Sequence, residues 1–168
     1  MKWLNVLLGL ALTVLVGCSK QSSSEPKRSS GKIQVVTTTT MVSDLVRQVG
    51  GDKVEIQGLM GPGVDPHLYK AAASDIRKVE SADVIFYSGL GLEGKMQNVF
   101  TKMARTNKQV YAVTEAIPQD RLMEPPEYDP HVWFDVPLWA RCIDVVVKGL
   151  SEYAPQHQDY FEKQGKAA

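Results

Sequence analysis

The chain has 168 residues, with 19 basic and 19 acidic side chains, so its formal net charge at pH 7 is zero. This balance, without a stripe of Lys and Arg, argues against a nucleic-acid-binding protein. The segment from Lys32 onwards is long enough to form one hydrophobic core.

Residues 1–17 are predicted to be a secretory signal peptide, because Lys2 supplies a positive charge ahead of an apolar run over residues 3–16. The run is too short for a transmembrane helix, which needs roughly 20 apolar residues. It ends in Leu-Val-Gly-Cys, which resembles the processing site of bacterial lipoproteins. The resemblance implies that Cys18 becomes the lipid-bearing amino terminus. The alternative is an ordinary signal peptide with an incidental cysteine.

Residues 18–31 are polar and rich in serine, and we expect them to form a flexible tether. A plain disordered terminus would have the same composition. If Cys18 carries a lipid, Cys142 has no partner, and no disulfide can form within the chain.

The body begins with a predicted strand at residues 33–37, followed by three threonines that can cap a helix. Apolar side chains at helical spacing over residues 41–49 predict that helix, and two glycines end it. Residues 54–59 alternate like a second strand. Gly-Pro-Gly at residues 61–63 then predicts a loop.

The same alternation continues further along the chain. Ser74 is predicted to cap a short helix, and residues 84–87 are an apolar run typical of a buried strand. A helical stripe from Leu92 to Met103 precedes a strand at residues 109–113. A loop rich in proline and acidic residues follows, over residues 114–130.

Two helices complete the pattern. Asp135 and Pro137 are predicted to start one whose apolar stripe runs to Leu150, and another begins near Pro155. Alternating strands and helices predict an α/β fold: a single lobe with a mainly parallel four-stranded sheet flanked by helices. Ligands of such folds usually bind at the carboxyl ends of the strands.

Two loops carry the same tripeptide. His67 and His131, 64 positions apart, each follow Asp-Pro directly. Proline makes each loop stiff, and neutral imidazole is a common ligand of transition metals. The neighbouring Asp could accept the second ring N–H and fix the tautomer. The simpler alternative is two solvated histidines in turns.

Other residues whose side chains could bind a metal are predicted to lie in the core or on the surface. Cys142, Met96 and Met103 lie on apolar helical stripes and are predicted to be core residues. Glu93, Glu115 and His157 are predicted to lie on the surface.

Five segments occur in a recognisable order: residues 61–69 (GPGVDPHLY), 74–75 (SD), 82–89 (ADVIFYSG), 92–93 (LE) and 129–133 (DPHVW). Together they resemble the metal-binding lipoproteins, the solute-binding subunits of bacterial manganese, zinc and iron ABC transporters. The resemblance implies two lobes joined by a long rigid helix, with the metal between them. The amino-terminal lobe supplies two histidines, which match His67 and His131, and the other lobe supplies two further ligands, usually carboxylates or a histidine.

The resemblance covers the amino-terminal half of that architecture. Residues 32–150 are expected to form the metal-binding lobe and residues 151–168 the start of the linking helix, with the second lobe absent. Gly165 is unexpected within the predicted linking helix, because glycine is a poor helix former. We therefore expect a truncated form, from a fragment, a split gene or a frameshift.

The function implied is capture of manganese, zinc or iron outside the cytoplasm and delivery to an ABC transporter permease. The protein is expected to be a monomer and not an enzyme, anchored by lipid on the periplasmic side or the cell surface. The alternatives are a metal-dependent hydrolase and an inert fragment. Zinc-dedicated members of the resembled family often carry a loop rich in histidine and acidic residues before the second histidine segment. Residues 114–127 hold no histidine, so the resemblance favours manganese or iron over zinc.

Overall fold

The computed structural model describes residues 31–106, 108–122 and 128–168. The predicted signal peptide, Cys18 and almost all of the predicted tether lie outside the described residues. Part of the loop over residues 114–130 lies outside them as well.

Four parallel strands form the sheet, in the order β2-β1-β3-β4. Their bounds are β1 Ile33–Thr37, β2 Val54–Gly58, β3 Val84–Tyr87 and β4 Gln109–Ala112. The predicted strands are confirmed, although β2 and β4 each end one residue earlier than expected. Because every strand runs in the same direction, the loops after β1, β2, β3 and β4 meet at one edge of the sheet.

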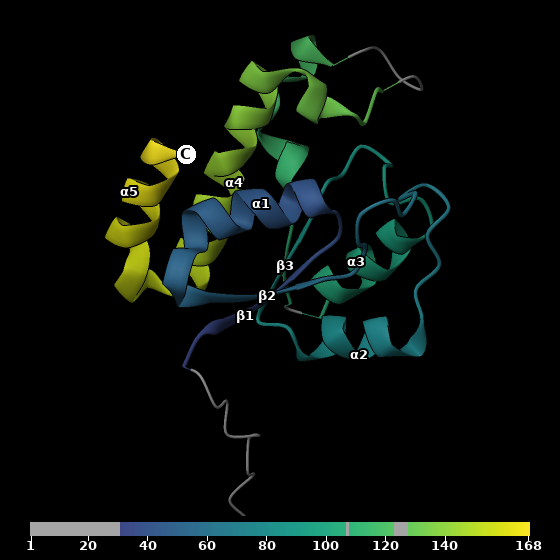
Figure 1. Ribbon diagram of the computed structural model, residues 1–168, viewed down its shortest axis with the longest axis horizontal. Coiled ribbons are helices and arrows are strands. Elements are labelled where there is room, and N and C mark those ends of the chain that lie inside the picture. Colours follow the sequence, from purple (N-terminus) through teal and green to yellow (C-terminus); the bar gives the residue numbers. More distant parts are fainter. Residues whose placement is uncertain (1–30, 107, 123–127) are drawn as a thin grey trace, which may run out of the picture.

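Helices cover both faces of the sheet (Figure 1). Helices α1 (Thr40–Gly50), α4 (Val136–Tyr153) and α5 (Gln158–Ala167) share one apolar core with side chains such as Val35 and Phe86. Helices α2 (Ala73–Ser81) and α3 (Met96–Ala104) share a second core with Val36 and Ile85. Strands covered on both faces explain the continuous apolar runs in the sequence.

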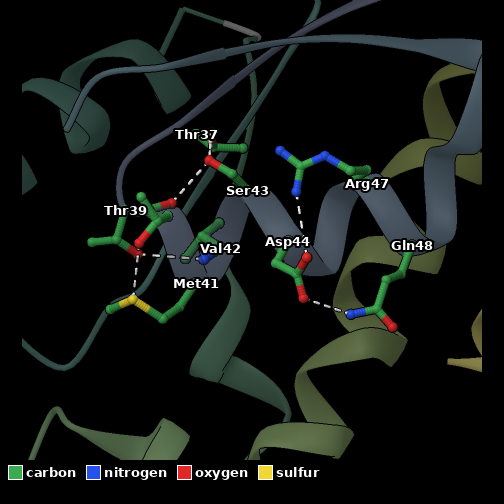
Figure 2. A network of polar contacts seen from close by, with 9 residues as sticks. Thr37, Thr39, Met41, Val42, Ser43, Asp44, Arg47 and Gln48 are labelled. Carbon is green, nitrogen blue, oxygen red and sulfur yellow. Dashed lines mark hydrogen bonds and ion pairs between the residues drawn. The ribbon is translucent and has the colours of Figure 1, made fainter. Parts of the chain in front are cut away.

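The start of α1 agrees with the prediction. The hydroxyl of Thr39 accepts a hydrogen bond from the backbone N–H of Val42 at 3.3 Å, which caps the helix (Figure 2). Ser43 lies 2.7 Å from the hydroxyl of Thr37, the last residue of β1, with either oxygen able to donate. These contacts fix the direction in which the chain leaves β1.

The prediction that Ser74 caps α2 is wrong. The helix begins one residue before Ser74, and the carboxylate of Asp75 accepts a hydrogen bond from the backbone N–H of Ala72 at 2.9 Å. A carboxylate in the first turn also interacts favourably with the helix dipole, so Asp75 takes the capping role. Leu92 is buried, but it lies in a turn that precedes α3.

The capping residue predicted for α4 is confirmed, because the carboxylate of Asp135 accepts from the backbone N–H of Leu138 at 3.1 Å. After α4, a 3₁₀ turn at Pro155–His157 leads into α5, which packs against α1 and α4. A Cβ atom on Gly165 would lie 2.6 Å from a methyl carbon of Val147 in α4. The close approach of the two helices therefore explains a glycine inside α5.

Four further 3₁₀ turns connect the elements within the described residues: Gly51–Lys53, Val113–Ala116, Gln119–Arg121 and Val132–Phe134. Among the helices that the structure describes, none combines the length and apolar character that crossing a membrane requires.

Candidate metal centre

The two Asp-Pro-His loops have the same local geometry. In each loop a carboxylate oxygen of the Asp accepts a hydrogen bond from the backbone N–H of the His two residues later, at 2.9 Å in both cases. Such an Asx turn is a local structure that needs no tertiary contact. The repeated tripeptide therefore gives His67 and His131 similar backbone surroundings.

The structure brings these two histidines together at the carboxyl edge of the sheet. Their Nε2 atoms lie 3.3 Å apart, and their ring centroids 5.3 Å apart in an edge-to-face arrangement. His67 is exposed and His131 is half-buried. Both imidazoles are therefore accessible to an ion from solvent.

The separation of the Nε2 atoms suits two ligands of one metal ion. Two nitrogens bound to tetrahedral zinc at roughly 2.0–2.1 Å stand about 3.3 Å from each other. Ligands at right angles with the same bond length would stand about 2.9 Å apart. The observed 3.3 Å equals the nitrogen–nitrogen separation of the tetrahedral arrangement.

The Asp residues differ in their contacts with the rings. Asp129 accepts a second hydrogen bond from Nδ1 of His131 at 2.7 Å, whereas the described contact of Asp65 with His67 is to the backbone. The pKa of Asp129 lies below its usual range because the carboxylate accepts from the backbone N–H and the ring of His131. An ionised carboxylate keeps the proton on Nδ1, so the Nε2 atom of His131 presents a lone pair.

An aromatic side chain also restrains His131. The ring of Trp133 meets the imidazole edge-to-face, with centroids 5.3 Å apart, and Trp133 in turn contacts Trp139 of α4. His131 is therefore held by the carboxylate of Asp129 and by the indole ring of Trp133. The described contacts of His67 are the backbone hydrogen bond to Asp65 and the approach of its ring to His131.

This difference predicts unequal effects of two matched substitutions. Asp129→Asn and Asp65→Asn each remove one negative charge near the histidines, and asparagine can keep the Asx turn in both loops. Asp129→Asn also removes the charge-assisted bond to the ring, so we expect about tenfold weaker zinc binding. Asp65→Asn should have a much smaller effect. Isothermal titration calorimetry of both variants measures the difference; equal losses would contradict the role of the ring contact.

The remaining ligand-type side chains lie apart from the two histidines. Within the described ranges, no third His, Cys, Asp or Glu forms a metal-binding group with them. His157 lines a hollow with Asp52 and Asp83 at the amino ends of the strands. Cys142 is buried, and burial raises the pKa of its thiol to about 12. Met96 is buried and Met103 partly buried, as predicted.

The two acidic residues behave differently from one another. Glu115 is on the surface as predicted and forms an ion pair with Lys148 at 3.6 Å. The prediction of a surface position for Glu93 is wrong, because its side chain is 1% exposed. Its carboxylate accepts hydrogen bonds from the hydroxyl of Thr38 and the backbone N–H groups of Ser88 and Gly89. Burial raises the pKa of Glu93 despite these donors.

Large apolar side chains close to the two histidines in the sequence are exposed. Leu68 follows His67 and is 74% exposed, and Phe134, three residues after His131, is 82% exposed. Val136 in the first turn of α4 is 71% exposed. Exposed apolar groups around a polar site are typical of a surface that meets another protein surface.

Comparisons with known proteins show the family of the chain. The family described as ZnuA, zinc-uptake complex component A periplasmic, matches residues 35–168. The chain is 45% identical over 159 residues to the manganese-binding lipoprotein MntA of Bacillus subtilis, covering 93% of this chain and 51% of MntA. It is 43% identical over 160 residues to the zinc-binding protein TroA of Treponema pallidum, covering 94% of this chain and 52% of TroA.

The solved structure of TroA from Treponema pallidum superposes with a TM-score of 0.77. The superposition covers 82% of this chain and 50% of that one, at 45% sequence identity. It confirms the predicted α/β lobe. The chain spans about half the length of the curated relatives it matches.

Proposed function

We propose, because the chain belongs to the ZnuA family of periplasmic zinc-uptake components, that it captures a divalent transition metal for an ABC transporter. The ion would be manganese, zinc or iron, and the receiving partner would be the permease of the transporter in the membrane. The observation that carries the proposal is the 3.3 Å separation of the Nε2 atoms of His67 and His131.

The two imidazoles would form half of the coordination shell. Nitrogen ligands suit borderline divalent metals, and the remaining positions would be filled by water or by side chains beyond the described residues. One chain suffices to bring both histidines together, so this half of the site needs no second copy.

We further propose that the exposed apolar rim of Leu68, Phe134 and Val136 packs against a second lobe. Covering this rim would remove apolar surface from water and would exclude water from the bound ion. Both effects would make the complete site stronger than its two histidines alone.

An enzymatic role has less support. Catalytic zinc usually has three protein ligands, an open position and a nearby general base. The described part of the chain brings together two candidate ligands, and the family is one of metal-transport proteins. Ester or phosphoester hydrolysis that depends on added zinc and is lost in His67→Ala would contradict a purely binding role.

A location outside the cytoplasm follows from the predicted lipoprotein signal. We expect the mature protein to begin at Cys18 and to carry a lipid that holds it on the outer side of a bacterial membrane. Mass spectrometry of protein extracted from membranes should find a lipid-modified amino-terminal Cys18. An unmodified Cys18, or a mature terminus elsewhere, would contradict the anchor; a Cys18→Ala variant recovered in the soluble fraction is the control.

The proposed half-site predicts an order of metal affinities. With two nitrogen ligands and no imposed geometry, zinc should bind more tightly than manganese, because the divalent series favours zinc. Titration calorimetry of the purified chain with each metal measures this order. Tight, manganese-selective binding that persists in the His67→Ala, His131→Ala double variant would show that other residues bind the metal.

A further inference from the structure

The loop after β3 lies against the backbone of the first histidine. We infer that Glu93 and Gly94 position His67: Glu93 fixes this loop, and Gly94 allows the carbonyl of His67 to lie against it. The inference rests on the proposed role of His67 as a metal ligand. It assigns a function to a buried carboxylate and a glycine that do not themselves touch the ion.

Glu93 ties together the segments that follow β1 and β3. One oxygen of its carboxylate accepts from the hydroxyl of Thr38 at 2.8 Å and from the backbone N–H of Ser88 at 2.5 Å. The other oxygen accepts from the backbone N–H of Gly89 at 3.1 Å. A buried carboxylate with three donors holds its surroundings in one arrangement, since moving any donor leaves a buried charge uncompensated.

The segment after β4 restrains the same loop from another side. The hydroxyl of Thr114 donates to the carbonyl of Ser88 at 2.7 Å. A Cβ atom on Gly89 would lie 2.5 Å from that hydroxyl oxygen. The loop that begins at Ser88 therefore has little room to move towards the sheet.

Gly94 is the point at which this loop meets His67. Its φ is +49°, and a Cβ atom there would lie 2.8 Å from the carbonyl oxygen of His67. The atom approached belongs to the backbone, so a rotamer change cannot relieve the clash. A side chain at position 94 must displace one of the two loops.

The loop of His67 is the one that should yield. Residues 61–65, 67 and 68 are exposed. In the loop after β3, Gly94 is exposed, but the preceding residue, Glu93, is buried. Displacement of the exposed loop breaks few contacts, whereas displacement of Gly94 strains the hydrogen bonds of the adjacent Glu93. The Nε2 atom of His67 would then leave its position beside His131.

Gly91 provides a matched control in the same loop. Its φ is +79°, and a Cβ atom there would meet nothing within 4 Å. Gly91→Ala and Gly94→Ala thus both place alanine at a positive φ, but Gly94→Ala also pushes on His67. We expect Gly94→Ala to weaken zinc binding on the order of tenfold by titration calorimetry, and Gly91→Ala to leave it almost unchanged.

A double-mutant cycle tests whether Gly94 acts through His67. Copper(II) binds nitrogen ligands more tightly than zinc, so weakened sites remain measurable with copper(II) as the probe. Gly94→Ala should lower copper affinity in the native background and have no further effect in a His67→Ala background. A purely structural role would lower affinity equally in both backgrounds and would overturn the inference.

The remaining outcomes separate the two proposals. If Gly94→Ala does not fold, Gly94→Asn and Gly91→Asn replace the pair, because asparagine tolerates a positive φ while keeping the Cβ atom. Equal zinc affinity in the two glycine variants overturns the inference alone. Unchanged zinc affinity in His67→Ala overturns the metal site, and the inference with it.

Discussion

Replacing either His67 or His131 by alanine should abolish measurable zinc binding at micromolar protein concentrations. Each substitution removes one of the two imidazoles whose Nε2 atoms lie 3.3 Å apart. One remaining imidazole cannot chelate the ion. We therefore expect a loss larger than the roughly 10–100-fold that removal of an outer-shell partner costs. Titration calorimetry measures the affinity, and a change in tryptophan fluorescence, to which Trp133 beside His131 contributes, gives an independent signal.

His157→Ala is the matched control, because His157 lies at the amino ends of the strands, in a different hollow. It should bind zinc like the native protein. Circular dichroism of all three variants should be unchanged, since His67 is exposed and His131 half-buried. A large loss of affinity in His157→Ala, or native affinity in His67→Ala, would exclude the proposed site.

The second prediction concerns the stability of the protein and the packing of α5 against α1 and α4. Phe161 is 0% exposed and lies in the core shared by α1, α4 and the sheet. Phe161→Ala should lower the free energy of unfolding by about 3–5 kcal/mol, because the substitution removes apolar contacts and leaves a cavity. The melting temperature should fall on the order of 10 °C. Thermal and urea unfolding measure both quantities.

Phe134→Ala provides the same chemical change at an exposed position. Phe134 is 82% exposed beside His131, so its removal should change the stability by less than about 0.5 kcal/mol. Similar losses in the two variants would show that α5 does not pack on the lobe as described. A stable Phe161→Ala protein would lead to the same conclusion.

Much of the fold could be predicted because it is encoded locally. β1 and β3 have the predicted bounds, and Thr39 and Asp135 cap α1 and α4. In each case a short pattern of apolar and capping residues specifies the element. The capping residue of α2 was predicted wrongly, because Ser74 and Asp75 are adjacent and both can cap. The contacts of Asp75 with Tyr69, in the preceding loop, and with Lys78, one turn later in the same helix, favour the carboxylate.

The sequence by itself determined the order of strands and helices along the chain, the stiff Asp-Pro-His loops that carry His67 and His131, and the family. These features depend on residue type and on spacing over a few positions. The tertiary structure decided the 3.3 Å separation of two histidines 64 positions apart, because they follow β2 and β4, the two outer strands of the sheet, and their loops meet above its carboxyl ends. It also decided the burial of Glu93, since a carboxylate can be buried where the hydroxyl of Thr38, from another loop, and backbone N–H groups of its own loop donate to it.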